Sequence, residues 1–277
     1  IIYILLFKKL NKLIIHLHGG SIDKDLFQKF PILKIINNFF YERLSSIIIT
    51  GESHRSIFSM VKKNNIVVVP NFVKEDLFIN PEDIKKLKNI SKIKVLYLSS
   101  MEKEKGYMDL LIAIEKTLKF FPDQFEFNFA GSFKFKKDEE IFKKRIKDKS
   151  NIFYHGFVDG IKKKELLHES HVFCLPTKYN EGQPISILEA YASGSMVLTT
   201  NKPGILDIFT KDLNGYIIKE GSPISIKNNL IKIIHNKHKI EKFGYYNLNI
   251  ALKKFKQGSY CKKIGRAHVW TPVTDVS

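Results

Sequence analysis

The chain has 277 residues, 44% of them hydrophobic, and a formal net charge of +18 at pH 7. A chain of this size and composition can bury a large core, and it has no hydrophobic run near the roughly 20 residues that cross a bilayer. Its two cysteines, Cys174 and Cys261, exclude a disulfide framework and fit a reducing cytosol. The positive charge predicts an anionic partner, such as nucleic acid, an acidic membrane surface or a phosphorylated substrate.

Short hydrophobic strands alternate with helices in the first 90 residues. Strands are expected at 11–18, 47–50 and 66–70, and helices at 30–43 and 52–63. This alternation predicts a parallel sheet with helices on both faces. Three strands are fewer than a complete Rossmann-like half needs, and the chain begins with Ile1 rather than Met, so we expect residues 1–90 to be a truncated N-terminal domain.

A second series of strands and helices follows a polar connection at 71–91. Its six strands are expected at 94–99, 125–131, 151–156, 172–176, 196–200 and 215–218. Six strands with intervening helices predict a complete doubly wound parallel sheet, in a domain over 91–235. We expect a Lys-rich helical segment at 236–264 and a non-native tail at 265–277, since the composition of the tail departs from the preceding sequence and resembles translated sequencing-adapter read-through.

Two glutamates eight positions apart flank the start of a short predicted helix in the stretch 179–194, YNEGQPISILEAYASG. Pro184 suits the first turn of a helix and Gly194 the left-handed residue that ends one. Helical side chains lean toward the N-terminus, so we expect Glu189 to point at the loop of Glu181 and both carboxylates to enter one small space. The helix dipole favours an anion in that space, together with the unpaired N–H groups of Gly182, Gln183, Ile185 and Ser186.

Residues just after the strands of the second series are further candidates, because ligands of an open parallel sheet lie beyond the carboxyl ends of its strands. Lys105 precedes Gly106 at a helix start and is a compact charge suited to a diphosphate. At Gly131 and Ser132 the glycine permits the backbone to approach a ligand closely. Taken alone, a lysine in a Lys-rich chain is more often a solvated side chain, as two arbitrary glutamates are.

The E-x7-E block, which opens as EGQP and closes as EA, resembles the retaining glycosyltransferases of glycosyl transferase group 1 (family 4). The resemblance covers about residues 12 to 255. It implies a GT-B fold, in which two Rossmann-like domains flank a nucleotide-sugar cleft and the last helix crosses back onto the N-terminal domain. It also implies transfer of a sugar from a nucleotide diphosphate sugar to a hydroxyl, with retention and without a metal or other cofactor.

The resemblance assigns roles to particular residues. Lys105 would bind the donor diphosphate, Glu181 the hydroxyls of the reacting sugar, and Glu189 the ribose. His18 would face the donor sugar, although a histidine beside a hydrophobic strand is as often structural, and residues around Val158 would hold the nucleobase. The other donor-binding candidates are Gly182, Gln183, Pro184, Ile185, Gly131 and Ser132.

One position departs from the family pattern. Many members carry an Arg where this chain has Ser100, so charge on the leaving diphosphate would depend on Lys105, the helix N-terminus and Lys103. His155 is expected to be a structural residue at a strand end.

Three alternatives stay open. A nucleotide-sugar epimerase of similar shape is disfavoured by the E-x7-E block, a nucleotide-sugar-binding fragment without turnover is compatible with a truncated chain, and nucleic-acid binding lacks a recognition motif. We expect a carbohydrate or lipid-linked acceptor, in polysaccharide or glycolipid biosynthesis. The expected location is cytoplasmic, with the basic surface resting on anionic lipid at the inner face of the plasma membrane.

Overall fold

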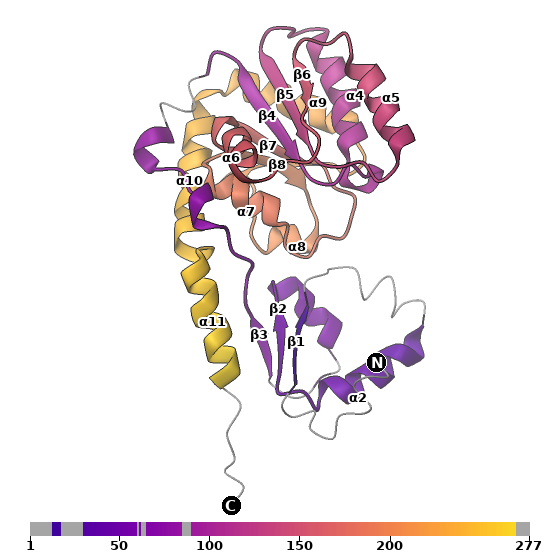
Figure 1. Cartoon of the computed structure of the whole chain (residues 1–277), viewed down its shortest axis with the longest axis vertical. Coiled ribbons are helices and arrows are strands. Elements are labelled where there is room, and N and C mark those ends of the chain that lie inside the picture. The colour runs from indigo at the N-terminus through magenta and orange to yellow at the C-terminus, as the bar shows by residue number, and fades with distance from the viewer. Residues whose placement is uncertain (1–12, 18–29, 60, 62–64, 85–89, 270–277) are drawn as a thin grey trace, which may run out of the picture.

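The computed structural model describes residues 13–17, 30–59, 61, 65–84 and 90–269. Two parallel sheets form its framework, and helices lie beside each of them (Figure 1). The α/β class and the six-stranded parallel sheet that the sequence predicts are confirmed. His18, one of the predicted site residues, lies outside the described residues.

The smaller sheet has three parallel strands in the order β1-β2-β3. Its core is made by hydrophobic side chains that include Leu44, Ile47 and Phe58. The described elements of this part are β1 (Ile14–Leu17), α2 (Pro31–Tyr41), β2 (Ser46–Ile49), the 3-10 helix η3 (Glu52–Phe58) and β3 (Ile66–Val68).

The helix predicted at 52–63 differs from the structure, which has the short 3-10 helix η3 instead. The N–H of Ser53 donates to the Asp207 carboxylate at 3.1 Å, and the Ser56 hydroxyl donates to the Ser53 carbonyl, also at 3.1 Å. That carbonyl is the acceptor that residue 57 would need in an α-helix. Serine side chains that bond to nearby backbone compete with the helical pattern in this way, and such competition favours the tighter turn.

The larger sheet has the strand order β6-β5-β4-β7-β8-β9. The chain runs outward from β4 to β6 and then returns to the other side of β4 to form β7, so the strand order reverses between β4 and β7. The strands are β4 (Ile93–Leu98), β5 (Phe125–Ala130), β6 (Ile152–Tyr154), β7 (Val172–Leu175), β8 (Met196–Thr200) and β9 (Gly215–Ile218), each within a predicted segment or one residue of it.

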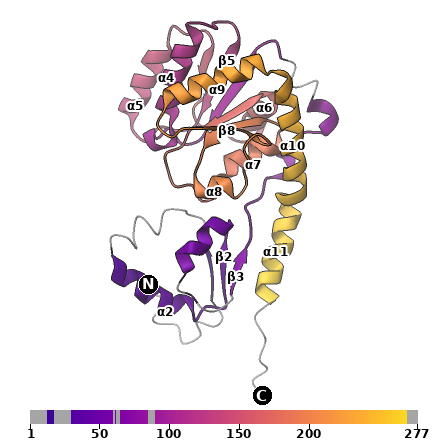
Figure 2. The ribbon, with the colours of Figure 1, turned by 180° about the vertical axis from the view of Figure 1, so that it is seen from behind.

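Helices connect these strands and cover both faces of the larger sheet (Figures 1 and 2). The connection from the smaller sheet contains two 3-10 turns, η4 (Glu75–Leu77) and η5 (Pro81–Asp83). The remaining helices are η6 (Lys103–Lys105), α4 (Tyr107–Leu118), α5 (Lys136–Ile146), α6 (Gly160–Glu169), α7 (Ile185–Ala192), α8 (Pro203–Leu206), α9 (Pro223–His235), α10 (His238–Lys254) and α11 (Gln257–Val269).

The last two helices return the chain to the smaller sheet. After α10, the Phe255 carbonyl accepts a hydrogen bond of 2.8 Å from the N–H of Val73. Helix α11 then packs Tyr260 and Ile264 in a cluster with Val69 at the end of β3. Figures 1 and 2 both show α11 lying alongside the smaller sheet. These contacts attach the C-terminal helices to the smaller sheet, which is formed by a distant part of the sequence.

A buried amide network anchors α10 to the larger sheet. The Asn247 side chain is fully buried, and its Nδ2 donates to the carbonyls of Ser195 at 2.7 Å and Asn214 at 3.0 Å. Its Oδ1 accepts from Asn214 Nδ2 at 2.7 Å. Each of these groups would be costly to bury without a partner.

Replacing Asn247 by Ala is expected to lower the free energy of unfolding by about 2 to 4 kcal/mol, because several buried polar groups lose their partners. Urea denaturation followed by circular dichroism measures the change. Asn249, which is exposed on the same helix, supplies the control variant Asn249→Ala, and we expect a change of no more than about 0.5 kcal/mol there. Equal losses in the two variants would contradict this account of how α10 is held.

Candidate functional site

A hollow of about 280 Å³ opens beyond the carboxyl ends of β4 and β7, where the strand order reverses. We call it the switch-point hollow. Ser99 follows β4 and Leu175 ends β7, while the start of α7 and the connection from the smaller sheet form the other walls. Its lining residues are Asn71, Ser99, Lys105, Leu175, Glu181, Gln183, Pro184, Ile185 and Ser186.

Lys105 and Glu181, two of the predicted site residues, form an ion pair in this hollow. Lys105 Nζ lies 2.7 Å from Glu181 Oε1, and the Thr177 hydroxyl donates to the same oxygen at 2.8 Å. The lysine also lies over the ring of Tyr179, 4.8 Å from its centroid. Both charged side chains are largely buried, so the pair is held in a defined geometry rather than moving in solvent.

Gly106 fixes the turn that presents Lys105. It has a left-handed backbone with φ of 82° between η6 and α4. A Cβ at this position would lie 2.1 Å from the Pro176 carbonyl oxygen, so no larger residue fits without displacing β7. The glycine that the sequence places after Lys105 is therefore required by the backbone of the neighbouring strand.

The N-terminus of α7 faces the same hollow with unpaired donors. The helix begins at Ile185, one residue later than predicted, and Pro184 is its N-cap rather than part of its first turn. Within the described parts of the chain, four N–H groups at this junction donate to no protein group. They belong to Gly182, Gln183, Ile185 and Ser186, and all but Gly182 also line the hollow. Such a helix end is suited to bind an anion.

Gln183 also ties the larger sheet to the smaller one. Its Nε2 donates to the Thr50 carbonyl at 3.0 Å, and its Oε1 accepts from the N–H of Asn71 at 2.6 Å. Asn71 Nδ2 returns a bond of 2.9 Å to the Gln183 carbonyl. A second tie joins Ser53 Oγ to the Asp207 carboxylate at 2.6 Å. The sequence indicates a role for Gln183 through its backbone, but it gives no sign of this bridging side chain.

Glu189 pairs with a lysine that the sequence does not single out. Its carboxylate is buried and pairs with Lys163 of α6, with 2.6 Å between Oε1 and Nζ, and it does not line the switch-point hollow. Glu181 lines the switch-point hollow and Glu189 does not, and each carboxylate is held by a different lysine, so a single space for both stays a prediction. Burial raises the pKa of Glu189, and Lys163 opposes that shift.

Lys163 is one of the residues around the site that sequence reasoning missed, as are Asn71 and Thr177. It is the middle lysine of three in the segment IKKKE, and nothing in the sequence separates it from its neighbours. Lys162 pairs with Glu165 on the surface at 3.5 Å, whereas Lys163 reaches a buried carboxylate.

Three further candidates have structural contacts of their own. Gly131 has φ of 146°, and a Cβ there would lie 1.8 Å from the Ser99 carbonyl oxygen, so its close approach is to β4. The Ser132 carbonyl accepts a bond of 2.9 Å from the N–H of Met101. Val158 is buried in the core of the larger sheet. The Ser100 carbonyl accepts a bond of 2.8 Å from the Tyr97 hydroxyl, so this turn is fixed by the fold.

His155 follows β6 and contacts a side chain of the neighbouring strand β5. His155 Nε2 lies 2.7 Å from Asn128 Oδ1 at the end of β6, an arrangement typical of a structural histidine. Over the described ranges, no group of three or more His, Cys, Asp or Glu side chains is placed to hold a metal ion. In the same part of the chain, no helix is both long enough and hydrophobic enough to cross a membrane.

Comparison with known proteins gives a family match over more than half of the chain. The model for Glycosyl transferases group 1 matches residues 79–249. MJ1069, an uncharacterised glycosyltransferase of Methanocaldococcus jannaschii, is 24% identical over 266 residues, which are 90% of this chain and 65% of that protein. An uncharacterised 41.2 kDa protein in the cps region of Klebsiella pneumoniae is 27% identical over 162 residues, which are 57% of this chain and 42% of that protein.

Solved structures show the same fold. Anabaena Alr3699/HepE, in complex with UDP and glucose, superposes with a TM-score of 0.74 at 18% identity, over 92% of this chain and 70% of that one. Sucrose-phosphate synthase from Thermosynechococcus elongatus has a TM-score of 0.77 at 14% identity, over 93% and 67%. The chain therefore has the fold of GT-B glycosyltransferases.

Replacing Lys163 by Met is expected to lower the free energy of unfolding by about 3 kcal/mol at pH 7, since an ionised Glu189 would then be buried without its cation. A carboxyl group whose folded pKa is raised contributes stability at low pH that is lost as the pH rises through that pKa. Without Lys163 the pKa rises further, so the deficit of the variant should grow with pH.

Urea titrations of the wild type and the variant between about pH 5 and pH 8 test this dependence. Lys162→Met is the matched control, because its partner is exposed and only a small change is expected. A deficit at Lys163 that stays constant over this pH range would contradict the assignment.

Proposed function

The chain belongs to the glycosyl transferases group 1, and from this premise we propose that it transfers a sugar from a nucleotide diphosphate sugar to an acceptor hydroxyl with retention of the anomeric configuration. The observation that carries the proposal is the Lys105–Glu181 pair beside the open N-terminus of α7. The solved complex of HepE with UDP and glucose supports a nucleotide sugar as the donor.

Departure of the nucleoside diphosphate is the step that needs stabilised negative charge. Lys105 and the residues with unpaired N–H groups Gln183, Ile185 and Ser186 line one hollow, and the unpaired N–H of Gly182 is next to them in the chain. Donors fixed in place before the reaction stabilise charge that develops in the transition state, and they cost no reorganisation. We assign the diphosphate to this end of α7 and infer that these groups do the work for which other transferases use a metal.

Glu181 would hold the reacting sugar. Its carboxylate already accepts from Lys105 and Thr177 through Oε1, and carboxylate oxygens can accept several hydrogen bonds, so sugar hydroxyls can be added. An ammonium group has three protons, which allows Lys105 to keep Glu181 while it binds a phosphate oxygen. The pair therefore connects the sugar to the leaving group.

Glu189 would accept the ribose hydroxyls, with Lys163 as a positioning residue. Lys163 holds Oε1 of the carboxylate and opposes its protonation. An ionised carboxylate can accept hydrogen bonds from both hydroxyls of a ribose. A protonated carboxyl carries one O–H donor and has less capacity to accept. The nucleobase is assigned to the turn around Val158, and His18 to the sugar.

The acceptor and the setting are assigned from the family resemblance. The chain spans 65% and 42% of the lengths of the two relatives, so the activity of the whole protein is part of this proposal. We propose a carbohydrate or lipid-linked acceptor, a role in polysaccharide or glycolipid biosynthesis, and a cytoplasmic location at an anionic membrane. The charge of +18 supports the last point.

Calorimetric titration with UDP, GDP and ADP is the test of the donor site. One nucleotide is expected to bind saturably, and Lys105→Ala and Glu189→Ala should each weaken its binding about 10- to 100-fold, the loss of one or two charged hydrogen bonds. Lys116→Ala, an exposed lysine of α4, is the control and should leave the affinity unchanged. A folded chain that binds none of the three would remove the transferase proposal and leave the family fold.

Retention is tested with the α-linked sugar of the nucleotide that binds. Slow hydrolysis of this donor should release the α anomer first, which proton NMR distinguishes from the β anomer before mutarotation. Lys105→Ala should slow the release about 100-fold, because charge on the leaving diphosphate then loses its cation. Initial release of the β anomer would show inversion instead.

A further inference from the structure

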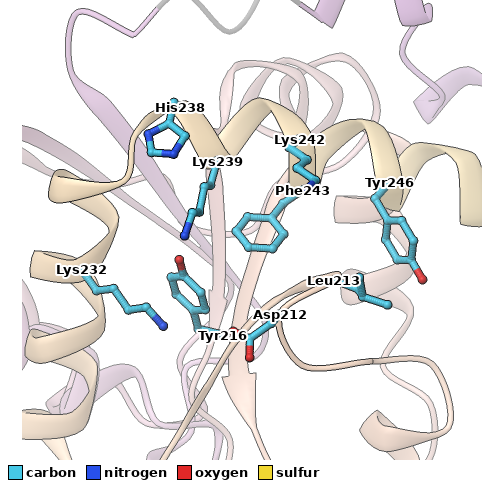
Figure 3. A pocket seen from close by; sticks show the side chains of 9 residues that line it. All are labelled: Asp212, Leu213, Tyr216, Lys232, His238, Lys239, Lys242, Phe243 and Tyr246. Atoms are coloured by element: carbon cyan, nitrogen blue, oxygen red, sulfur yellow. The ribbon is translucent and has the colours of Figure 1, made fainter.

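A second hollow, of about 380 Å³, lies between β9 and the helices α9 and α10 (Figure 3). We call it the basic hollow. Its walls include Tyr216, Lys232, His238, Lys239, Lys242 and Phe243. Among the described residues it shares no lining residue with the switch-point hollow, so it is a separate feature that the transferase mechanism does not use.

Three lysines at this hollow have no acidic partner in the described part of the chain. Lys232, Lys239 and Lys242 form no salt bridge there, unlike Lys94, which pairs with Glu169 at 2.7 Å. Figure 3 shows Lys232 and Lys239 reaching toward Tyr216 from α9 and α10. Asp212 is the acidic lining residue, so three ammonium groups face one carboxylate.

Aromatic rings form the inner wall between these charges. The Tyr216 and Phe243 rings meet edge to face with 5.5 Å between their centroids, and Lys232 Nζ lies 3.7 Å from the centroid of Tyr216. Burial raises the pKa of Tyr216, so its hydroxyl stays protonated and can donate a hydrogen bond. A ligand that joins an anionic group to an apolar or ring-shaped body would match both kinds of wall.

The position of these cations in the sequence is unusual for a helix. Lys237 is the N-cap of α10, His238 and Lys239 follow in its first turn together with the acidic Glu241, and Lys242 comes next. Cations at a helix N-terminus oppose the helix dipole, at a cost of about 0.3 to 1 kcal/mol each. Positions that break such a local rule are expected at functional sites. An anion in the hollow would interact favourably with both the lysines and the dipole.

We propose that the basic hollow binds a phosphate group, carried either by a small soluble compound or by a lipid headgroup. Ammonium groups are compact point charges that suit phosphate, and Lys232, Lys239 and Lys242 approach from two helices rather than one. The volume exceeds that of a phosphate alone, and the rings of Tyr216 and Phe243 contact the part of the ligand that carries it. This proposal does not depend on the proposed transferase function.

Calorimetric titration with inorganic pyrophosphate tests the soluble source. It is made in the Lys105→Ala background, which weakens phosphate binding at the switch-point hollow and leaves any remaining binding there the same in variant and control. Adding Lys239→Ala and Lys242→Ala should weaken the binding at least about tenfold, since two charged hydrogen bonds are lost. The matched control adds Lys116→Ala and Lys253→Ala, which remove the same charge from exposed positions elsewhere.

Sedimentation with vesicles tests the lipid source, using phosphatidylcholine alone and phosphatidylcholine mixed with phosphatidic acid. Loss of pyrophosphate binding in the Lys239 and Lys242 variant, but not in the control, supports a soluble ligand. Selective loss of binding to the acidic vesicles, without pyrophosphate binding, supports a headgroup. Equal behaviour of variant and control in both assays, with thermal melting showing that both are folded, would overturn the proposal.

Discussion

The reversal of strand order between β4 and β7 is the constraint on which the candidate site depends. Neighbouring strands whose connections lead to opposite sides leave a crevice at their carboxyl ends, and ligands of open α/β sheets bind there. The backbones around the crevice are packed so closely that glycine is required at Gly106, beside Pro176, and at Gly131, beside Ser99. Lys105 is presented by the first of these turns. The strand order determines where the crevice lies, and close packing at the two glycines fixes the backbone around it.

The smaller sheet completes the site rather than lying beside it. Asn71 lines the switch-point hollow and is bonded to Gln183, which also bonds to Thr50. The hollow therefore has its present shape only while the two sheets are held together by these bonds and by Asp207. Separation of the sheets would expose the N-terminus of α7 to water. Fixed N–H donors stabilise a negative charge less in water than in a closed site.

The sequence predicted the strands because each is a short, nearly continuous hydrophobic run between turn residues, and it predicted the start and end of α7 from Pro184 and Gly194. It could not predict η3, which depends on Ser53 meeting Asp207 from a distant part of the chain. For the same reason it missed Lys163, since a long-range ion pair leaves no local pattern among many lysines. Lys105 and Glu181 could be proposed from the sequence because each has a local signal: Lys105 directly precedes a glycine, and Glu181 lies just before the start of α7.

The charge of the site is nearly balanced before any ligand binds. Glu181 and Glu189 each pair with one lysine, at 2.7 Å and 2.6 Å, so the two ion pairs add no net positive charge to the site. The surplus of positive potential comes instead from the unpaired N–H groups of α7 and its dipole, equivalent to about half a charge. These groups cannot move away or titrate. Recognition of an anion at this site is therefore proposed to depend on the backbone of the E-x7-E segment as well as on Lys105.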